Sequence, residues 1–252
     1  MNIHFIVAPS THLRPLMAEL HKRHHITTLP EEMTATIDYV VVDPHLSHTH
    51  PDLLQAQHLG LNILSPTSFL YEYFKHKTRV VITGNKGRKE VLARVLHTMV
   101  FCNQPVSYYF ESPIEGKQVH FADTEFVLIE GNEEEAMLHP TVALISDMIE
   151  ENKDIYKQFI EGITQGGILI YNEEDLLLNE LVGNNESPIR KMEYGTPAFE
   201  THNGETYLIT PEGELPLGET STEQLSYIEA AKWVCQNMGI DEADFYEAMA
   251  SI

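Results

Sequence analysis

The sequence predicts an α/β fold of two consecutive domains, each built on an open, mostly parallel sheet. Short apolar runs of the β type alternate with segments of helical length from the first residues onward. At residue 79 the alternation starts again with a new apolar run and a glycine-containing turn. The 252 residues, 42% of them hydrophobic, suffice for the cores of two modest domains. We therefore expect a first domain over residues 1–77 and a second over residues 78–252.

The first domain is expected to begin with a strand, a loop and a helix. IHFIVA is a short apolar run, and Ser10 or Thr11 can cap a helix that ends at His21. Strand and helix alternating at this spacing favour a parallel sheet. The further elements expected here are strands at residues 37–43 and 62–66 and helices at 51–59 and 69–76.

The second domain repeats that opening with a longer helix. RVVIT predicts a strand, GNKGRKE a turn, and VLARVLHTMVF a helix with a continuous apolar face. Asn-Gly and Glu-Gly pairs separate two short β runs in residues 201–218. The other elements expected are strands at residues 125–130, 141–146 and 166–171 and helices at 155–162, 222–238 and 241–250.

The negative charge is concentrated in the second half of the chain. Residues 1–109 contain ten Lys and Arg against eight Asp and Glu, whereas residues 110–252 contain six against thirty. A half this acidic repels nucleic acid and acidic membrane surfaces, so neither is expected as a partner. No apolar run is long enough for a secretion signal or a membrane span, and the two cysteines form no metal or disulfide pattern. A cytoplasmic location is therefore expected.

Seven of the sixteen cations gather in one segment, where a phosphate could find local compensation. They are Lys75, Lys77, Arg79, Lys86, Arg88, Lys89 and Arg94. A solvated basic surface around a strand is the alternative interpretation of this cluster.

Each domain opens with the local design that holds phosphate, a strand, a loop and a helix. Backbone N–H groups at a helix N-terminus point at the anion, and the helix dipole favours it. The second of these loops consists of Gly84, Asn85, Lys86, Gly87, Arg88 and Lys89. With its flanks, VVITGNKGRKEVLARVL, it resembles the ATP loop of the Mur ligases, whose pattern is G-T-x-G-K-[ST]-[ST]. The resemblance implies a Rossmann-like domain for a UDP-sugar, followed by a P-loop-type central α/β domain for ATP.

Two substitutions separate this loop from the family pattern. Arg88 stands where the family has its phosphate-binding lysine, and it can still contact phosphate as a planar fork. Lys89 stands where the family has its magnesium-binding hydroxyl. An ammonium group has no lone pair and cannot ligate Mg²⁺. We expect anion binding to remain open to this loop and ATP turnover to be lost.

The opening IHFIVAPSTHLRPLMAELHKRHHIT resembles the family's IHFIGIGGxGMSxLAxLLxxxGHxV, whose loop cradles the diphosphate of the UDP-sugar. Here Ser10, Thr11 and His12 lie in the equivalent loop, and the family's glycines are replaced. Pro9 removes an amide donor and Val7 adds bulk, which opposes close approach of the backbone to a diphosphate. Tight UDP binding in the family manner is therefore not expected.

Two further segments resemble the parts of the family that place ligands near the ATP-bound metal. EFVLIEGNEEE resembles Y-L-V-A-E-A-D-E-S, with Glu130 and Glu133 at its two glutamates. LHPTVALISDMIEENKDIY follows L-x-P-x-V-A-x-x-T-N-I-x-x-D-H-x-D-x-Y without a gap, with Glu151 and Asn152 at its Asp-His pair. An oxygen ligand can replace the lost imidazole only in part. The resemblance implies a vestigial metal site of these four residues.

The resemblance also covers the segment after residue 214. LPLGETSTEQL is similar to the family's G-x-H-N-x-x-N helix start, which meets the adenine, but keeps only Gly218 and has Thr220, Ser221 and Gln224 at its other three positions. The family's third domain, which carries the incoming amino acid, would begin about where Ile252 ends the chain. We expect that C-terminal ligase domain to be absent.

Two functional hypotheses follow. The first is a non-catalytic Mur-ligase homologue that needs no cofactor and binds a UDP-sugar, a nucleotide, another anion or a partner protein in the cleft between its domains. The second is an ATP- and Mg²⁺-dependent acid–amino acid ligase of the UDP-N-acetylmuramate type, completed by a separate chain. In the family, ATP phosphorylates the substrate carboxylate and an amine attacks the acyl phosphate. Losing the loop lysine and the metal-binding hydroxyl together favours the first hypothesis.

Fourteen histidines also raise the question of a metal site. DPHLSHTHPD offers His45, His48 and His50 with Asp43 and Asp52 nearby, a spacing that suits an extended loop chelating Zn²⁺ or Ni²⁺. Loop histidines that are merely solvated are the alternative.

Overall fold

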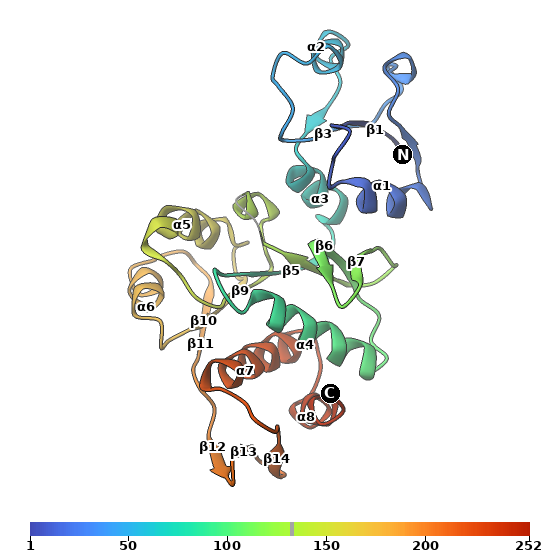
Figure 1. The fold of residues 1–252 in the computed structure, drawn as a ribbon. Coiled ribbons are helices and arrows are strands. Elements are labelled where there is room, and N and C mark those ends of the chain that lie inside the picture. Colours follow the sequence, from blue (N-terminus) through green and yellow to red (C-terminus); the bar gives the residue numbers. More distant parts are fainter. Residues whose placement is uncertain (132–133) are drawn as a thin grey trace.

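The computed structural model describes residues 1–131 and 134–252, which form three sheets and the helices that cover them (Figure 1). A four-stranded sheet comes first, a seven-stranded sheet follows, and a three-stranded sheet projects at the opposite end of the molecule from the first. The predicted α/β class with mostly parallel sheets is confirmed. Among the described residues, no helix is both long and apolar enough to cross a membrane.

The first sheet has the order β2-β1-β3-β4, and all its neighbours are parallel. Because β2 lies on one side of β1 and β3 on the other, the chain reverses its direction of winding between β1 and β3. Crevices at such a reversal, beyond the carboxyl ends of the strands, are where open α/β sheets bind ligands. The elements are β1 (Asn2–Ile6), α1 (Arg14–His21), β2 (His25–Thr27), η1 (Pro30–Glu32), β3 (Tyr39–Val42), α2 (Pro51–His58), β4 (Ile63–Leu64) and α3 (Pro66–Phe74).

The first helix starts later than the predicted caps require. Leu13 is the N-cap of α1 and makes no side-chain cap, while Pro15 fixes the first turn. The Thr11 hydroxyl accepts a hydrogen bond from the amide of Leu13 (3.2 Å), which is the N-cap residue itself, and not from an amide inside the helix. The prediction that Ser10 or Thr11 caps α1 is therefore wrong, whereas its end at His21 is confirmed.

The seven-stranded sheet has the order β11-β10-β9-β5-β8-β6-β7 and is parallel except for β7, which pairs antiparallel with β6. The strands that the sequence predicted lie at the centre of this sheet. The sequence did not predict β6, β7 and β11, which lie at or next to the edges of the sheet. Its strands are β5 (Thr78–Thr83), β6 (Ser107–Ile114), β7 (Lys117–His120), β8 (Phe126–Glu130), β9 (Val142–Ile145), β10 (Ile168–Asn172) and β11 (Arg190–Tyr194).

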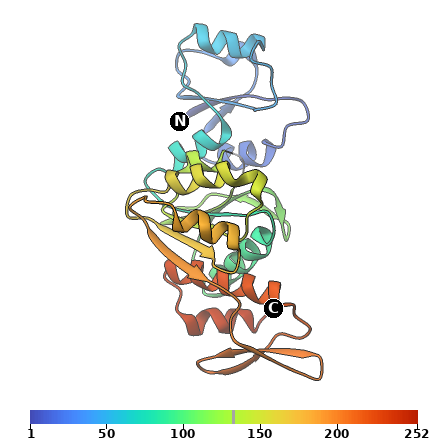
Figure 2. The ribbon, with the colours of Figure 1, turned by 90° about the vertical axis from the view of Figure 1, so that its left-hand side faces the viewer.

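Helices cover both faces of this sheet, and β5 shows why (Figure 2). Val80 and Ile82 point into one hydrophobic core and Val81 into the other, because successive side chains of a strand alternate between faces. One face packs on α4 (Arg88–Phe101), α7 (Thr222–Asn237) and α8 (Glu242–Met249). The other packs on α5 (Lys153–Gly162) and α6 (Leu176–Gly183). Two 3₁₀ turns, η2 (Glu135–Leu138) and η3 (Glu150–Asn152), lie on the connections.

The third sheet is a three-stranded antiparallel meander. Where the sequence predicted two short β runs, the structure has β12 (Phe199–His202), β13 (Glu205–Thr210) and β14 (Gly213–Pro216). The predicted turns at Asn203-Gly204 and Glu212-Gly213 connect them.

The first two sheets share a core through α3. Phe69 and Phe74 of α3 belong to the same buried cluster as Phe5 of β1 and Val81 of β5. Two hydrogen bonds reinforce this contact, from the Phe121 amide to Glu19 Oε1 (3.0 Å) and from Ser65 Oγ to Glu134 Oε2 (2.7 Å). The domain division at residues 77–78 stays a prediction.

Candidate functional site

The loop between β5 and α4 requires both of its glycines. Gly84 has φ 141° and Gly87, the N-cap of α4, has φ 72°, both in the region that side chains other than glycine rarely adopt. A Cβ atom at Gly84 would lie 1.9 Å from Ser146 Oγ, and one at Gly87 would lie 2.1 Å from the Tyr227 ring. The loop is therefore a tight turn that requires glycine at both positions and packs against Ser146, which follows β9, and against Tyr227 of α7.

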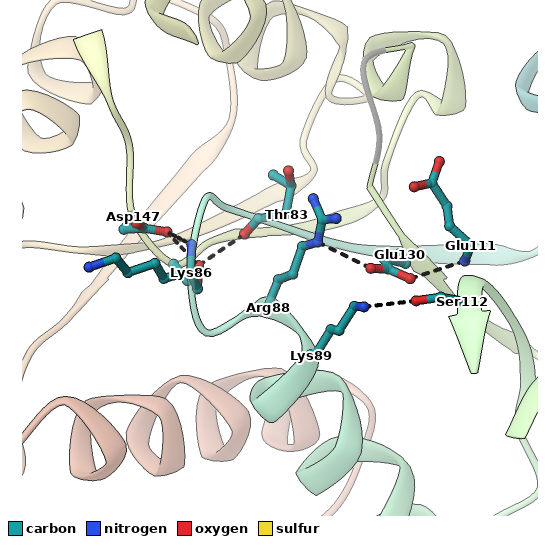
Figure 3. Close-up of polar contacts among 9 residues, drawn as sticks. Thr83, Lys86, Arg88, Lys89, Glu111, Ser112, Glu130 and Asp147 are labelled. Atoms are coloured by element: carbon teal, nitrogen blue, oxygen red, sulfur yellow. Dashed lines mark hydrogen bonds and ion pairs between the residues drawn. The ribbon is translucent and has the colours of Figure 1, made fainter. Parts of the chain in front are cut away.

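A carboxylate of the protein already occupies one amide of this loop. Asp147 Oδ1 accepts a hydrogen bond from the Lys86 amide (2.7 Å), as Figure 3 shows. The Ser146 hydroxyl donates to the Lys86 carbonyl and lies 3.3 Å from the Thr83 carbonyl oxygen. In loops of this kind the backbone amides are the groups that would face a phosphate. Here the Lys86 amide donates to a side-chain carboxylate of the protein.

Two cations of the loop, Arg88 and Lys89, bond to neighbouring side chains (Figure 3). Arg88 Nε donates to Glu130 Oε1 at 3.1 Å, and Glu130 is only 1% exposed. The second oxygen of Glu130 accepts the Glu111 amide (3.0 Å). Lys89 Nζ donates to Ser112 Oγ (2.8 Å). Arg88 and Glu130, both predicted site residues, thus satisfy one another.

Glu135 is a buried carboxyl beside this loop that the sequence did not reveal. It is 2% exposed, and a Cβ on Gly131 would lie 2.4 Å from its Oε2. Burial raises the pKa of Glu135 to about 8, although a hydrogen bond with Thr83 and the charge of Arg88 act in the opposite direction. Nothing in a run of consecutive glutamates distinguishes the member that folds inward. Its predicted neighbour Glu133 lies outside the described residues.

Three motifs that are distant in sequence meet around one pocket of about 830 Å³. The loop forms one wall, Asn152 and Tyr156 another, and Ser221 and Gln224 of the first turn of α7 a third. Ser221 caps α7 by accepting the Gln224 amide (3.2 Å), so its hydroxyl is tied to the helix. Carboxylates also line this pocket, from Glu90 and Glu223. The predicted neighbour Glu151 is exposed and is not part of the pocket lining.

The cation cluster of residues 75–94 divides between the two ends of β5. At the amino end, Arg79 is buried and donates to backbone carbonyls, including Leu138 O (2.8 Å) and Lys77 O (2.9 Å). At the carboxyl end, Lys86, Arg88 and Lys89 line the pocket. Only this second group can serve an anion there.

The loop after β1 differs from the loop after β5. Pro9, Ser10 and His12 are exposed, and the Arg14 guanidinium donates to the Pro9 carbonyl (2.7 Å). The His12 ring lies edge-on to the ring of His45, with centroids 5.8 Å apart. Asp43, which directly follows β3, is buried. His50 Nδ1 accepts the Asp52 amide (3.3 Å) at the start of α2. Of the three histidines proposed together, the structure brings His45 to His12, and not to His48 or His50.

Comparison with known proteins gives relatives of one kind. No family model matches the chain. A UDP-N-acetylmuramate–L-alanine ligase of Trichlorobacter lovleyi is 20% identical over 167 residues, which are 60% of this chain and 37% of the relative. The chain thus matches little more than a third of that relative's length.

Solved structures give the same result for the fold. A murein peptide ligase from Psychrobacter arcticus superposes with a TM-score of 0.76 at 12% identity, covering 100% of this chain and 68% of that one. The UDP-N-acetylmuramate–alanine ligase from Thermotoga maritima gives 0.71 at 15% identity, with the same coverage. In sequence and in fold the chain therefore resembles the Mur ligases, as the order and spacing of its motifs predicted.

Proposed function

We propose that this chain is a non-catalytic Mur-ligase-like protein of the cytoplasm, with a binding or regulatory role linked to peptidoglycan precursor metabolism. The observation that carries the proposal is the phosphate loop closed on the protein's own carboxylates. The Lys86 amide is engaged by Asp147, and the Arg88 guanidinium by the buried Glu130. The relatives are ligases that act on UDP-N-acetylmuramate, and this chain matches only part of their length.

Charge argues against triphosphate cleavage at this loop. Two unit charges 4 Å apart interact by about 4 kcal/mol near a protein surface, so each carboxylate here opposes a phosphate strongly. The residue at the family's magnesium-binding position is Lys89, whose ammonium group donates to Ser112. Phosphoryl transfer depends on positioned cations that neutralise the developing charge. Without a metal-binding oxygen at this position, the reaction loses its main source of stabilisation.

The retained scaffold supports a binding role. The loop, Asn152 and the first turn of α7 still surround an open pocket, and both glycines of the loop have positive φ values that favour glycine. Residues 84–89, with Glu130 and Asn152, are therefore proposed as a vestigial nucleotide site. Compared with the family pattern, the chain keeps the framework of this site and changes the residues that would contact a ligand.

Calorimetric titration with MgATP and with UDP-N-acetylmuramic acid tests the proposal. We expect no turnover, and for MgATP a dissociation constant weaker than about 1 mM, because Asp147 engages the Lys86 amide and Glu130 engages the Arg88 guanidinium. Micromolar binding of both ligands together with product formation would overturn it. The double variant Arg88→Lys, Lys89→Thr restores the family residues and is the matched comparison. A gain in MgATP affinity in this variant locates the defect in the loop.

An active ligase completed by a second chain is the alternative, and the pocket of about 830 Å³ beside the loop is the observation that favours it. In that case Arg88 would hold the terminal phosphate, and Glu130 and Glu133 would help to place Mg²⁺. Phosphate release on mixing the chain with MgATP, UDP-N-acetylmuramate and amino acids distinguishes the two. Release that depends on Arg88, lost in Arg88→Ala, supports the ligase and excludes the non-catalytic role.

A further inference from the structure

Three potential metal ligands meet at the carboxyl edge of the first sheet. His12 lies in the loop after β1, and Asp43 and His45 lie in the loop after β3. One ligand atom of each lies within 4.8 Å of the other two. Since β1 and β3 are adjacent parallel strands, both loops leave the same edge of the sheet, at the point where the winding reverses. The topology therefore explains how residues 31 and 33 positions apart come together.

The carboxylate of this group is buried and incompletely hydrogen-bonded. Asp43 is 1% exposed, and its Oδ1 accepts the His45 amide (3.0 Å). Its Oδ2 is buried and, within the described part of the chain, has no hydrogen-bond partner of good geometry. A buried carboxylate oxygen without a hydrogen-bond partner is costly, and a cation beside it removes that cost.

The two histidines are exposed, so their imidazoles are free to turn. With metal–nitrogen distances of about 2.0–2.1 Å, neighbouring ligand atoms around a tetrahedral ion lie about 3.3 Å apart. The separations here reach at most 4.8 Å, so closing them needs a movement of about 1.5 Å, within reach of side-chain rotation.

We propose that His12, Asp43 and His45 form a binding site for a divalent transition-metal ion of the Zn²⁺ class. Two imidazoles and one carboxylate suit Zn²⁺, Co²⁺ and Fe²⁺, whereas Mg²⁺ and Ca²⁺ prefer oxygen ligands alone. Three protein ligands leave at least one coordination position open. That position faces solvent beside the exposed loop of Pro9 and Ser10, where a water molecule or an anionic oxygen can complete the shell.

The site is independent of the phosphate loop. It belongs to the first sheet, and none of its three residues lines the pocket beside Gly84–Lys89. The sequence neighbours of His45 are not part of the site. Among the described residues, neither His48 nor His50 belongs to the group whose ligand atoms lie within 4.8 Å of one another. His48 is exposed and lies on the same loop as His45, so it provides a matched control.

Zn²⁺ titration of the full chain, after removal of metal by a chelator, tests this assignment. Competition with a chromogenic chelator gives the affinity, and Co²⁺ gives a visible spectrum that reports the ligand set. We expect one equivalent to bind tighter than roughly 10 µM, and His12→Ala and His45→Ala each to weaken it about 100-fold or more. His48→Ala should leave the affinity within about twofold of the parent chain.

Absence of stoichiometric binding, or equal losses in His48→Ala and His45→Ala, would overturn the site. Circular dichroism confirms that each exposed-histidine variant is folded. Asp43→Asn tests the buried ligand. Because this substitution can also affect folding, a crystallographic measurement on the parent chain complements it. Anomalous scattering at the zinc absorption edge from a crystal soaked in ZnCl₂ must place the ion between His12 and His45. An ion bound only elsewhere on the chain contradicts the proposal.

Discussion

The carboxyl edges of the two parallel sheets carry buried carboxyl groups of opposite character. Asp43, directly after β3, lies beside the Thr11 hydroxyl and the amides of His45 and Ala8, and these lower its pKa in spite of burial. Glu135, beside the end of β5, is buried with fewer donors, and its pKa rises to about 8. At neutral pH the first edge therefore presents an anion and the second a largely neutral acid. The same local topology thus produces a candidate cation site in one sheet and a closed loop in the other.

The loops that follow β1 and β5 also differ, in their glycine content and in how tightly they pack. The loop after β5 has two glycines, Gly84 and Gly87, that pack so tightly on Ser146 and Tyr227 that no side chain fits at either position. The loop after β1 has no glycine, is largely exposed, and brings His12 out to His45. A shared strand–loop–helix order does not fix the chemistry at its turn, because the side chains of neighbouring loops decide it.

The largest expected effect breaks the tightly packed loop. Gly87→Ala should destabilise the chain by about 3–5 kcal/mol or prevent folding, because the left-handed conformation and overpacking each cost about 1–3 kcal/mol. The control Gly60→Ala has φ 65° but nothing within 4 Å of the added Cβ, so only the conformational cost of about 1 kcal/mol applies. Urea unfolding measures both. Equal losses would show that packing on Tyr227 contributes nothing.

The next effect tests the contrast between the two acids through pH. The folded pKa of Glu135 is about 8 against an ordinary value of 4.5, so the folded state binds more protons between these values. Stability should then fall as pH rises from about 4.5 to 8 and level off above it. Glu135→Gln mimics the protonated acid, removes this decline, and should be more stable than the parent by about 4 kcal/mol at pH 8. Thermal melts from pH 5 to 9 compare the two. A parallel decline in both chains would refute the assignment.

The smallest effect reopens the loop to anions. Asp147→Asn keeps an oxygen that can accept the Lys86 amide but removes the negative charge. Because Asp147 is only half-buried, solvent screens much of its field, and we expect pyrophosphate to bind about tenfold more tightly, or about 1.4 kcal/mol. Asp123→Asn, an exposed acid away from the pocket, controls for net charge. A similar gain in both variants would mean that the effect is not local to the loop.

The central strands and most helices were predictable because hydrophobic periodicity is a local property of the chain. β5, β8, β9 and β10 lie within two residues of the expected limits. The strands β6, β7 and β11, at or next to the edges of the sheet, were missed, since their partly exposed residues do not form a continuous apolar run. The start of α1 was misplaced because two residues with good capping side chains precede the actual N-cap, Leu13.

The motifs of the candidate site were also visible in the sequence, since residues 84–89, Asn152, Ser221 and Gln224 line the same pocket. The residues that pack against the loop from elsewhere in the fold were not visible in the sequence. Asp147 and Tyr227 contact the loop from the segment after β9 and from α7, and Glu135 of η2 lies beside Thr83 at the end of β5. No spacing along the chain indicates that these residues meet there. In the same way, His45 was grouped with its sequence neighbours, whereas the fold pairs it with His12.

The sequence by itself determined where the central strands, most helices and the two loops lie, because these depend on residue type and spacing over a few neighbours. Only the tertiary structure decided which charges face one another, since contacts across parallel strands join residues that are tens of positions apart. The balance between burial and the surrounding donors then set the charge state of each group. Asp43 and Glu135 are both carboxyl residues at a sheet edge, and the donors around each one, placed by other segments, give them opposite pKa shifts.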